Sequence, residues 1–209
     1  MRMEHQDFSE RWAQEHGNVS TRGLVGAWLR LSHRLAKICT ALRIGPNALT
    51  ALGLFAAVGT ALFSPQWWIA FLLLLSLLCD GIDGSTAILQ NKADAMGATL
   101  DSVADRVSES FWAIAFYRLG APLTWIVALW MVATIQEYVR ARLGSEGVRE
   151  IGVITLAERP VRALALLVAI ILAQFHETSG WVNGVAIIMT SLQIISFAQI
   201  LIFARKSLK

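Results

Sequence analysis

Residues 80–105 read DGIDGSTAILQNKADAMGATLDSVAD, and the stretch before them, from Trp67 to Cys79, is apolar apart from one serine. Asp80 and Asp83 are three residues apart, and Asp101 and Asp105 are four residues apart, so each pair shares one helical face. Both pairs fall at the ends of adjacent apolar helices that we expect to run antiparallel, which lets the carboxylates converge. Carboxylates grouped in an apolar setting lose their charge unless a cation compensates it.

These four carboxylates predict a divalent metal site. A ligand set with only oxygen atoms suits Mg²⁺ or Mn²⁺, and Mg²⁺ commonly leaves coordination positions to substrate phosphate oxygens. The pattern therefore indicates phosphoryl-type chemistry. Three other uses of the aspartates stay open: capping of helix ends, pairing with Arg106, and a lining for a cation pathway.

The composition excludes an ordinary soluble domain. Of the 209 residues, 56% are hydrophobic and 16% are charged, against about 45–50% and about 25% in soluble proteins. A formal charge of +3 is too small for a nucleic-acid-binding protein unless the positive charges are clustered, and two cysteines indicate no disulfide framework. The first residues are charged and contain no apolar run, so we expect no cleaved signal peptide.

The long apolar stretches predict an all-α integral membrane protein with six transmembrane helices. Each stretch is about long enough to cross the hydrocarbon core, and Pro46, Pro65, Pro122 and Pro160 each sit where a helix can begin. The expected spans are 47–64, 66–88, 97–119, 122–141, 159–175 and 181–203.

Positive charge orients these spans. The segments expected on the inner side hold sixteen of the eighteen Lys and Arg residues, and the outer connections hold only Arg118. We therefore expect both termini and the aspartates on the cytoplasmic side. Ahead of the first span, apolar residues from Leu24 to Leu42 recur at steps of three and four, which predicts an amphipathic helix on the membrane surface or packed on the protein. The expected organisation is a cytoplasmic segment 1–45 and a membrane domain 46–209.

The aspartate segment resembles the signature of the CDP-alcohol phosphotransferases, D-x2-D-G-x2-A-R-x8-G-x3-D-x3-D. The matching positions are Asp80, Asp83, Gly84, Ala87, Gly97, Asp101 and Asp105, whereas Ile88 stands where the family has Arg. The stretch Pro46–Thr50 is also similar to the start of that family's first helix. The resemblance implies six spans after a surface helix, and usually a homodimer.

The resemblance implies a role for each aspartate. Asp80, Asp83 and Asp101 would hold two Mg²⁺ or Mn²⁺ ions on the diphosphate of a CDP-linked lipid. Asp105 would be the catalytic base that takes the proton of the acceptor hydroxyl while also touching a metal ion.

Other signature positions would contact the CDP-lipid. Gly84, Ala87 and Gly97 leave room for a nucleotide against the helix, although Gly97 could equally allow two spans to pack closely. Asn47 and Thr50 could reach the nucleotide, although Asn47 beside Pro46 is also an ordinary helix start. The Ile88 departure removes a guanidinium, for which Lys92 or Arg106 could compensate, or else it weakens activity.

Four arginines predict where the second substrate binds. Residues 137–142 and 158–162 are similar to the corresponding segments of family members that make phosphatidylinositol phosphate, and guanidinium groups bind phosphate in a bidentate manner. The candidate acceptor residues are Arg140, Arg142, Arg159 and Arg162. The same arginines could simply meet lipid headgroups on the inner side.

The expected function is transfer of a phosphatidyl group from CDP-diacylglycerol to inositol 1-phosphate, with release of CMP, in the cell membrane of a bacterium. Glycerol 3-phosphate and phosphatidylglycerol are the alternative acceptors. A membrane protein that binds CDP-lipids without catalysis is the alternative class.

Overall fold

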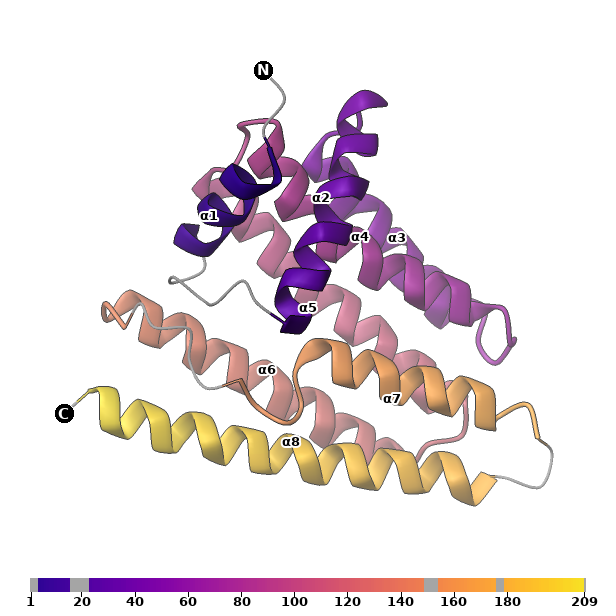
Figure 1. Ribbon diagram of the computed structural model, residues 1–209. Coiled ribbons are helices and arrows are strands. Elements are labelled where there is room, and N and C mark those ends of the chain that lie inside the picture. Colours follow the sequence, from indigo (N-terminus) through magenta and orange to yellow (C-terminus); the bar gives the residue numbers. More distant parts are fainter. Residues whose placement is uncertain (1–3, 16–22, 149–153, 176–178, 209) are drawn as a thin grey trace. The chain divides into compact units, whose positions relative to one another are not determined.

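The computed structural model describes residues 4–15, 23–148, 154–175 and 179–208, so residues 1–3 and 16–22 of the predicted N-terminal segment lie outside the described part. Within the described residues the chain forms eight α-helices and no strand (Figure 1). The helices are α1 (His5–Glu15), α2 (Gly23–Ala41), α3 (Pro46–Leu62), α4 (Ile69–Leu89), α5 (Ala95–Arg118), α6 (Leu123–Ser145), α7 (Arg159–Leu172) and α8 (Ser179–Ser207). The fold is therefore all-α, as the sequence predicts.

Four of the helices end in the same way, with one residue in the left-handed conformation. These residues are Arg43 after α2, Asn91 after α4, Gly120 after α5 and Gly147 after α6, with φ of 59°, 52°, 101° and 85°. In each case the next residue donates its backbone N–H to a carbonyl in the last turn of the helix. This arrangement satisfies terminal carbonyl groups and turns the chain sharply.

The chain divides into two compact units. The first unit contains Met1–Phe55 and Leu75–Val107, and the second unit contains Ala56–Leu74 and Ser108–Lys209. The helices α3, α4 and α5 each contribute residues to both units.

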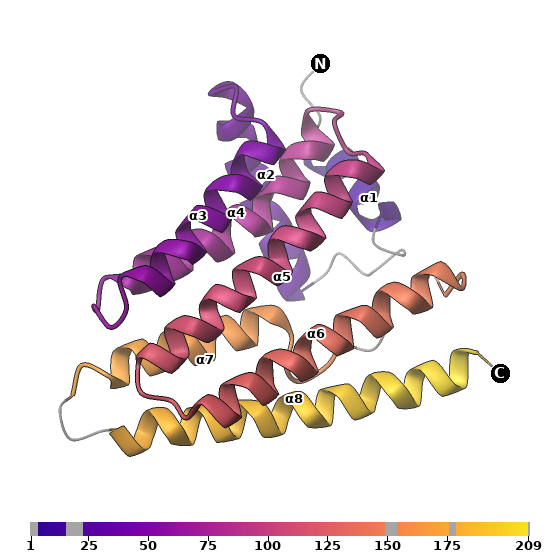
Figure 2. The same ribbon diagram turned by 180° about the vertical axis from the view of Figure 1, so that it is seen from behind.

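Two apolar clusters hold the first unit together. Cys39, Leu49, Cys79 and Ile82 join α2, α3 and α4. A second cluster, of Phe8, Leu29 and Ile88, fixes α1 and α2 on the last turn of α4 (Figures 1 and 2). The helix α1 is absent from the sequence-based prediction.

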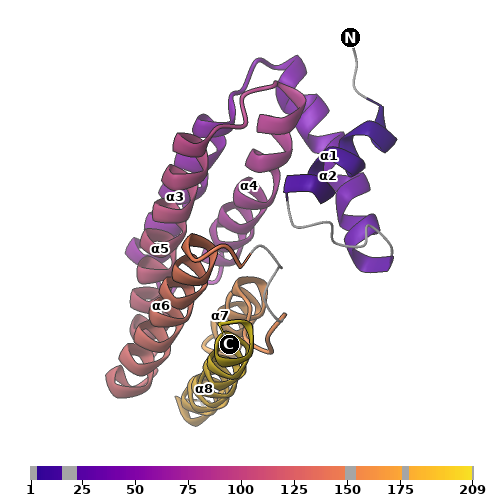
Figure 3. The same ribbon diagram turned by 90° about the vertical axis from the view of Figure 1, so that its left-hand side faces the viewer.

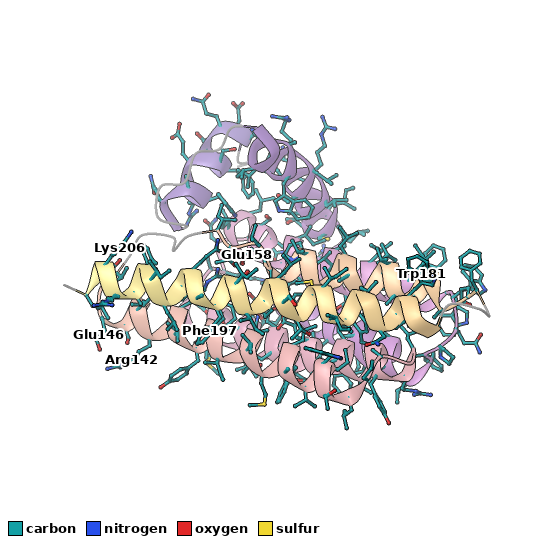
Figure 4. The ribbon with its side chains drawn as sticks, turned by 90° about the horizontal axis from the view of Figure 1, so that it is seen from below. Arg142, Glu146, Glu158, Trp181, Phe197 and Lys206 are labelled. Atoms are coloured by element: carbon teal, nitrogen blue, oxygen red, sulfur yellow. The ribbon has the colours of Figure 1, made fainter. Side chains whose placement is uncertain are left out.

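The second unit is built around α8. This helix packs against both α6 and α7 (Figure 3). Seen from below, α6 and α8 run side by side, with Arg142 of α6, Glu146 just after α6 and Lys206 of α8 near one end, and Trp181 near the other end of α8 (Figure 4). Gln193 of α8 donates a hydrogen bond to Gln136 of α6 over 2.9 Å, and both side chains are fully buried.

The predicted spans all coincide with helices, α3 to α8, within a few residues at most ends. Among the described residues, α4 (Ile69–Leu89) and residues Gly180–Ser207 of α8 are long and apolar enough to cross a membrane by themselves. The bent pair Val25–Ala41 and Pro46–Leu62, with 108° between its halves, gives a third span if it counts as one. The helix α5 is long but carries charged residues along its length, which lowers its mean hydropathy. A count of six spans stays a prediction.

The surface helix predicted before the first span is α2. Part of its apolar stripe is exposed, since Leu31 and Ile38 are 47% and 56% exposed, whereas Leu35 packs against the cluster around Cys39. A different face, with Leu29, Ala36 and Cys39, is buried in the first unit. The position of this helix on the membrane surface stays a prediction.

Candidate active site

The first unit brings the aspartates together through a short turn between α4 and α5. The helix α4 carries Asp80 and Asp83 in its last turns, and α5 carries Asp101 and Asp105 near its start. Asp94 caps α5, because its Oδ1 accepts the backbone N–H of Gly97 over 2.6 Å. The turn thus returns the chain so that residues about twenty positions apart meet.

Three of the four aspartates form one cluster. One carboxylate oxygen from each of Asp80, Asp101 and Asp105 lies within 4.8 Å of the other two, and the three residues are half-buried. The nitrogen Nη2 of Arg106 lies 3.9 Å from Asp105 Oδ2. Three carboxylates at this separation are the ligand set that a hard divalent cation prefers. The residues present therefore fit a metal site.

Asp83 is held separately, beside this cluster in the first unit. Its Oδ2 accepts a hydrogen bond from Thr50 Oγ1 over 2.6 Å, and its Oδ1 accepts the backbone N–H of Gly84 over 2.6 Å. The residue is only 4% exposed. Thr50, which the sequence suggests as a nucleotide contact, thus orients an aspartate in the structure.

A pocket of about 530 Å³ opens in the same unit, between α3, the end of α4 and the start of α5. All five residues predicted to contact the CDP-lipid line it, together with two of the aspartates. The lining includes Asn47, Thr50, Asp83, Gly84, Ala87, Gly97 and Asp101.

The two glycines on the pocket wall differ in what surrounds them. A Cβ atom added at Gly84 would meet nothing within 4 Å, so this glycine leaves the pocket open. A Cβ at Gly97 would lie 3.0 Å from Asp94 Oδ1, the oxygen that caps α5. The structure therefore connects Gly97 with the cap of its own helix, rather than with the packing of two spans.

The predicted acceptor arginines all lie in the second unit, where glutamates pair with them. Arg140 binds both carboxylate oxygens of Glu158, over 2.5 and 2.9 Å. Arg162 is buried and donates to Glu109 over 2.5 Å. The sequence indicated the arginines as candidates, but it did not indicate that these glutamates pair with them.

The other two arginines have different surroundings. Arg159 is nearly buried, lies 3.9 Å from Glu109 and stacks over the ring of Trp112, 5.1 Å from its centroid. Arg142 is 64% exposed and pairs with Glu146 one turn away, just after α6 (Figure 4). The cluster of Arg140, Arg159 and Arg162 with Glu109, Glu137 and Glu158 is formally neutral. An acceptor phosphate in this cluster would compete with carboxylates for the guanidinium groups.

The Arg140–Glu158 pair should make stability depend on pH. Burial acts to raise the pKa of Glu158, but hydrogen bonds from Arg140 and Thr155 outweigh it and hold this pKa below its ordinary value of 4.5. A lowered pKa stabilises the fold above the ordinary value, and the contribution is lost as pH falls through the lowered pKa.

We therefore expect Glu158→Gln to reduce the Tm in detergent at about pH 7, and the difference from the parent to shrink as the pH falls below 4.5 and through the lowered pKa. Glu146→Gln, in an exposed pair, should change the Tm little at any pH. A Tm difference for Glu158→Gln that stays constant from neutral to acidic pH contradicts the assignment.

Comparison with known proteins shows which family the sequence around the aspartates belongs to. A sequence profile described as CDP-alcohol phosphatidyltransferase matches residues 43–198, which cover most of the chain and the whole aspartate segment. The chain belongs to the CDP-alcohol phosphatidyltransferase family. This membership makes it an enzyme of the phosphatidyltransferase class.

Relatives with assigned names lie within this family. The chain is 29% identical over 188 residues to the phosphatidylinositol phosphate synthase of Mycolicibacterium smegmatis, covering 80% of this chain and 83% of that protein. It is 32% identical over 146 residues to the archaetidylinositol phosphate synthase of Aeropyrum pernix, covering 66% and 74%.

The fold is also known from a crystal structure. The phosphatidylinositol phosphate synthase of Mycobacterium tuberculosis, solved with CDP-DAG bound, matches with a TM-score of 0.67 at 20% identity, covering 83% of this chain and 93% of that one. The same protein solved with manganese and citrate matches with a TM-score of 0.61 at 19% identity, covering 81% and 88%. With the apolar helices α4 and α8, these relatives indicate that this CDP-alcohol phosphatidyltransferase is a membrane protein.

One position departs from the family signature. Ile88 is 1% exposed and packs against Phe8 of α1 and Leu29 of α2. A charged side chain at this position would be buried under two helices. Of the two residues that the sequence suggests as compensation, Lys92 lines the pocket and Arg106 lies near Asp105.

Proposed function

We propose that the protein transfers a phosphatidyl group from CDP-diacylglycerol to inositol 1-phosphate and releases CMP. The observation that carries the proposal is the grouping of Asp80, Asp101 and Asp105 within 4.8 Å, in the unit that also holds the pocket lined by Asp83 and Asp101. The names of the bacterial relatives support inositol phosphate as the acceptor.

In this proposal Asp80, Asp83, Asp101 and Asp105 would hold two Mg²⁺ or Mn²⁺ ions. Such ions neutralise charge on the transferring phosphoryl group and on the departing nucleotide. Thr50 and the Gly84 N–H fix both oxygens of Asp83, so its carboxylate is oriented before substrate arrives. The pocket between α3, α4 and α5 binds the cytidine diphosphate part of the donor, with Gly84 and Ala87 leaving room for it.

The chain's own catalytic residue is Asp105. Its carboxylate takes the proton from the acceptor hydroxyl as that oxygen forms a bond to the lipid-bearing phosphorus. The bond from this phosphorus to the bridging oxygen breaks, and CMP leaves with that oxygen. Because the carboxylate is a weak base, its contribution depends on position.

The acceptor phosphate is proposed to meet Arg140, Arg142, Arg159 and Arg162. Paired arginines are compatible with this role, since a dianionic phosphate can take over hydrogen bonds from a carboxylate. Glycerol 3-phosphate carries the same phosphate, so the arginines alone do not discriminate between the two acceptors.

The wider architecture is part of the same proposal. We infer that α3 to α8 form six spans of one domain, residues 46–209, with residues 1–45 and both termini in the cytoplasm, and that the protein forms a homodimer. The positive charge on the segments between the spans supports this orientation.

A transfer assay tests the function. The full chain in lipid vesicles is given CDP-diacylglycerol, Mg²⁺ and one labelled acceptor at a time: inositol 1-phosphate, glycerol 3-phosphate or phosphatidylglycerol. We expect labelled lipid and an equal amount of CMP with inositol 1-phosphate, and loss of both when EDTA removes the metal. Transfer to another acceptor overturns the acceptor assignment. Binding of CDP-lipid without transfer to any acceptor would indicate a non-catalytic protein.

A further inference from the structure

The pocket of the first unit has one basic residue on its wall. Its acidic lining residues are Asp83, Asp94 and Asp101, and Lys92 is its only lysine or arginine among the described residues. Lys92 is exposed, and within the described part of the chain no ion pair occupies its ammonium group. The ammonium is therefore available to an anion that enters the pocket.

The backbone conformation fixes the position from which the Lys92 side chain extends. Asn91 adopts the left-handed conformation with φ of 52°, and its N–H bonds the carbonyl of Ile88 over 3.2 Å. The N–H of Lys92 bonds the carbonyl of Ala87, a pocket residue, over 2.8 Å. Lys92 thus leaves the end of α4 at a defined point on the pocket wall.

The N-terminal helix α1 contacts the turn that contains Asn91 and Lys92. Arg11 of α1 donates from Nη1 to Asn91 Oδ1 over 2.7 Å. The same helix is anchored by Phe8, which packs against Ile88 with both side chains buried. One helix therefore both covers position 88 and contacts the residue that precedes Lys92.

We propose that Lys92 binds the diphosphate oxygens of the CDP-linked donor, and that Arg11 is a positioning residue that acts on Lys92 through Asn91. The proposal rests on the proposed function for the identity of the ligand. A diphosphate held near several aspartates needs positive charge beyond the metal ions, and Ile88 offers none. The flexible ammonium supplies a point charge that reaches phosphate from a turn.

The substitution Lys92→Met removes the positive charge and keeps nearly the same side-chain size, so it tests the role of the charge. The expected result is a KM for CDP-diacylglycerol raised about tenfold to a hundredfold, with kcat changed much less, since a charged hydrogen bond to the donor is lost. Lys92→Arg should recover most of the affinity. Lys206→Met, at an exposed lysine near the end of α8, is the matched control and should leave KM unchanged. A KM for Lys92→Met equal to that of the control overturns the proposal.

A binding measurement separates this proposal from the proposed function. Equilibrium dialysis of labelled CDP with Mg²⁺ should give a Kd raised by a similar factor in Lys92→Met, whether or not the protein transfers phosphatidyl groups. An unchanged Kd for CDP contradicts the role of Lys92. Weakened CDP binding in a chain without transfer activity contradicts only the proposed function.

The positioning role has its own test. Arg11→Gln should raise the KM for CDP-diacylglycerol about threefold in the parent, as expected for an exposed contact. It should have no further effect in Lys92→Met, where the charge to be positioned is gone. An equal effect of Arg11→Gln in both backgrounds would show that Arg11 does not act through Lys92.

Discussion

Asp105→Asn is expected to lower the rate of CMP release about 10²–10⁴-fold, the usual contribution of a positioned general base. The amide keeps the size of the side chain but cannot take a proton from the acceptor hydroxyl. It also leaves Asp80 and Asp101, the other members of the cluster, in place. The variant should therefore fold and keep much of its affinity for the metal.

Two comparisons make this prediction specific. Ser102→Ala is the matched control, because Ser102 lies on the same helix, is exposed, and bonds only the Ala98 carbonyl one turn earlier. Binding of Mn²⁺ to the detergent-solubilised protein should be weakened more by Asp101→Asn than by Asp105→Asn. Turnover of Asp105→Asn within tenfold of the parent would show that Asp105 is not the base.

The helices could be predicted because their signals are local. Pro46 begins α3, Pro122 precedes the first residue of α6, and Pro160 stands in the first turn of α7. Pro65 is the exception, since Trp67 and Trp68 form a turn and α4 begins only at Ile69. A proline permits a helix start but does not require one at the next residue.

The helix α1 could not be predicted from apolar periodicity. Its sequence is mostly polar, and Phe8 is placed by contacts with Leu29 and with Ile88, eighty residues later. The departure at Ile88 was visible in the sequence. Its cause, burial under the N-terminal helices, required the fold.

The aspartates were predictable because their spacing is itself the signal, whereas the arginine partners were not. The pair Arg162–Glu109 joins residues 53 positions apart, and nothing in the local sequence links them. Glu109 does continue the four-residue spacing of Asp101 and Asp105, which could have marked it as an inward-facing position of α5. The positive-inside rule explains why arginines gather in this region, but it does not say which carboxylates meet them.

Glu109→Gln is expected to destabilise the protein by about 3–5 kcal/mol, because it removes the nearest carboxylate of the buried Arg162 guanidinium and leaves three arginines of the cluster with two glutamates. Both side chains are 7% exposed, and Arg162 also donates to the Ala157 carbonyl and to Gln193. These neutral acceptors do not balance a full positive charge. The measurement is thermal or denaturant unfolding of the purified protein in one detergent.

Glu146→Gln provides the contrast, since it breaks an ion pair that is equally short but exposed. Arg142 and Glu146 lie 2.6 Å apart, and their side chains are 64% and 46% exposed, so we expect a loss of at most about 0.5 kcal/mol. Both variants remove a carboxylate from an ion pair. The difference between their losses of unfolding free energy therefore measures the effect of burying the pair. Equal losses would mean that the Glu109–Arg162 pair is not a structural element of the second unit.

The double variant Glu109→Leu with Arg162→Met separates folding from catalysis at this pair. Replacing both charges with apolar groups should recover most of the stability that Glu109→Gln loses, because the remaining Arg140 and Arg159 with Glu137 and Glu158 are again formally neutral. Its KM for inositol 1-phosphate then reports on the loss of Arg162, together with any effect of removing Glu109 from beside Arg159. A raised KM in a stable double variant supports contact between Arg162 and the acceptor phosphate. A KM equal to that of the parent would leave the pair a purely structural one and confine the acceptor phosphate to Arg140, Arg142 and Arg159.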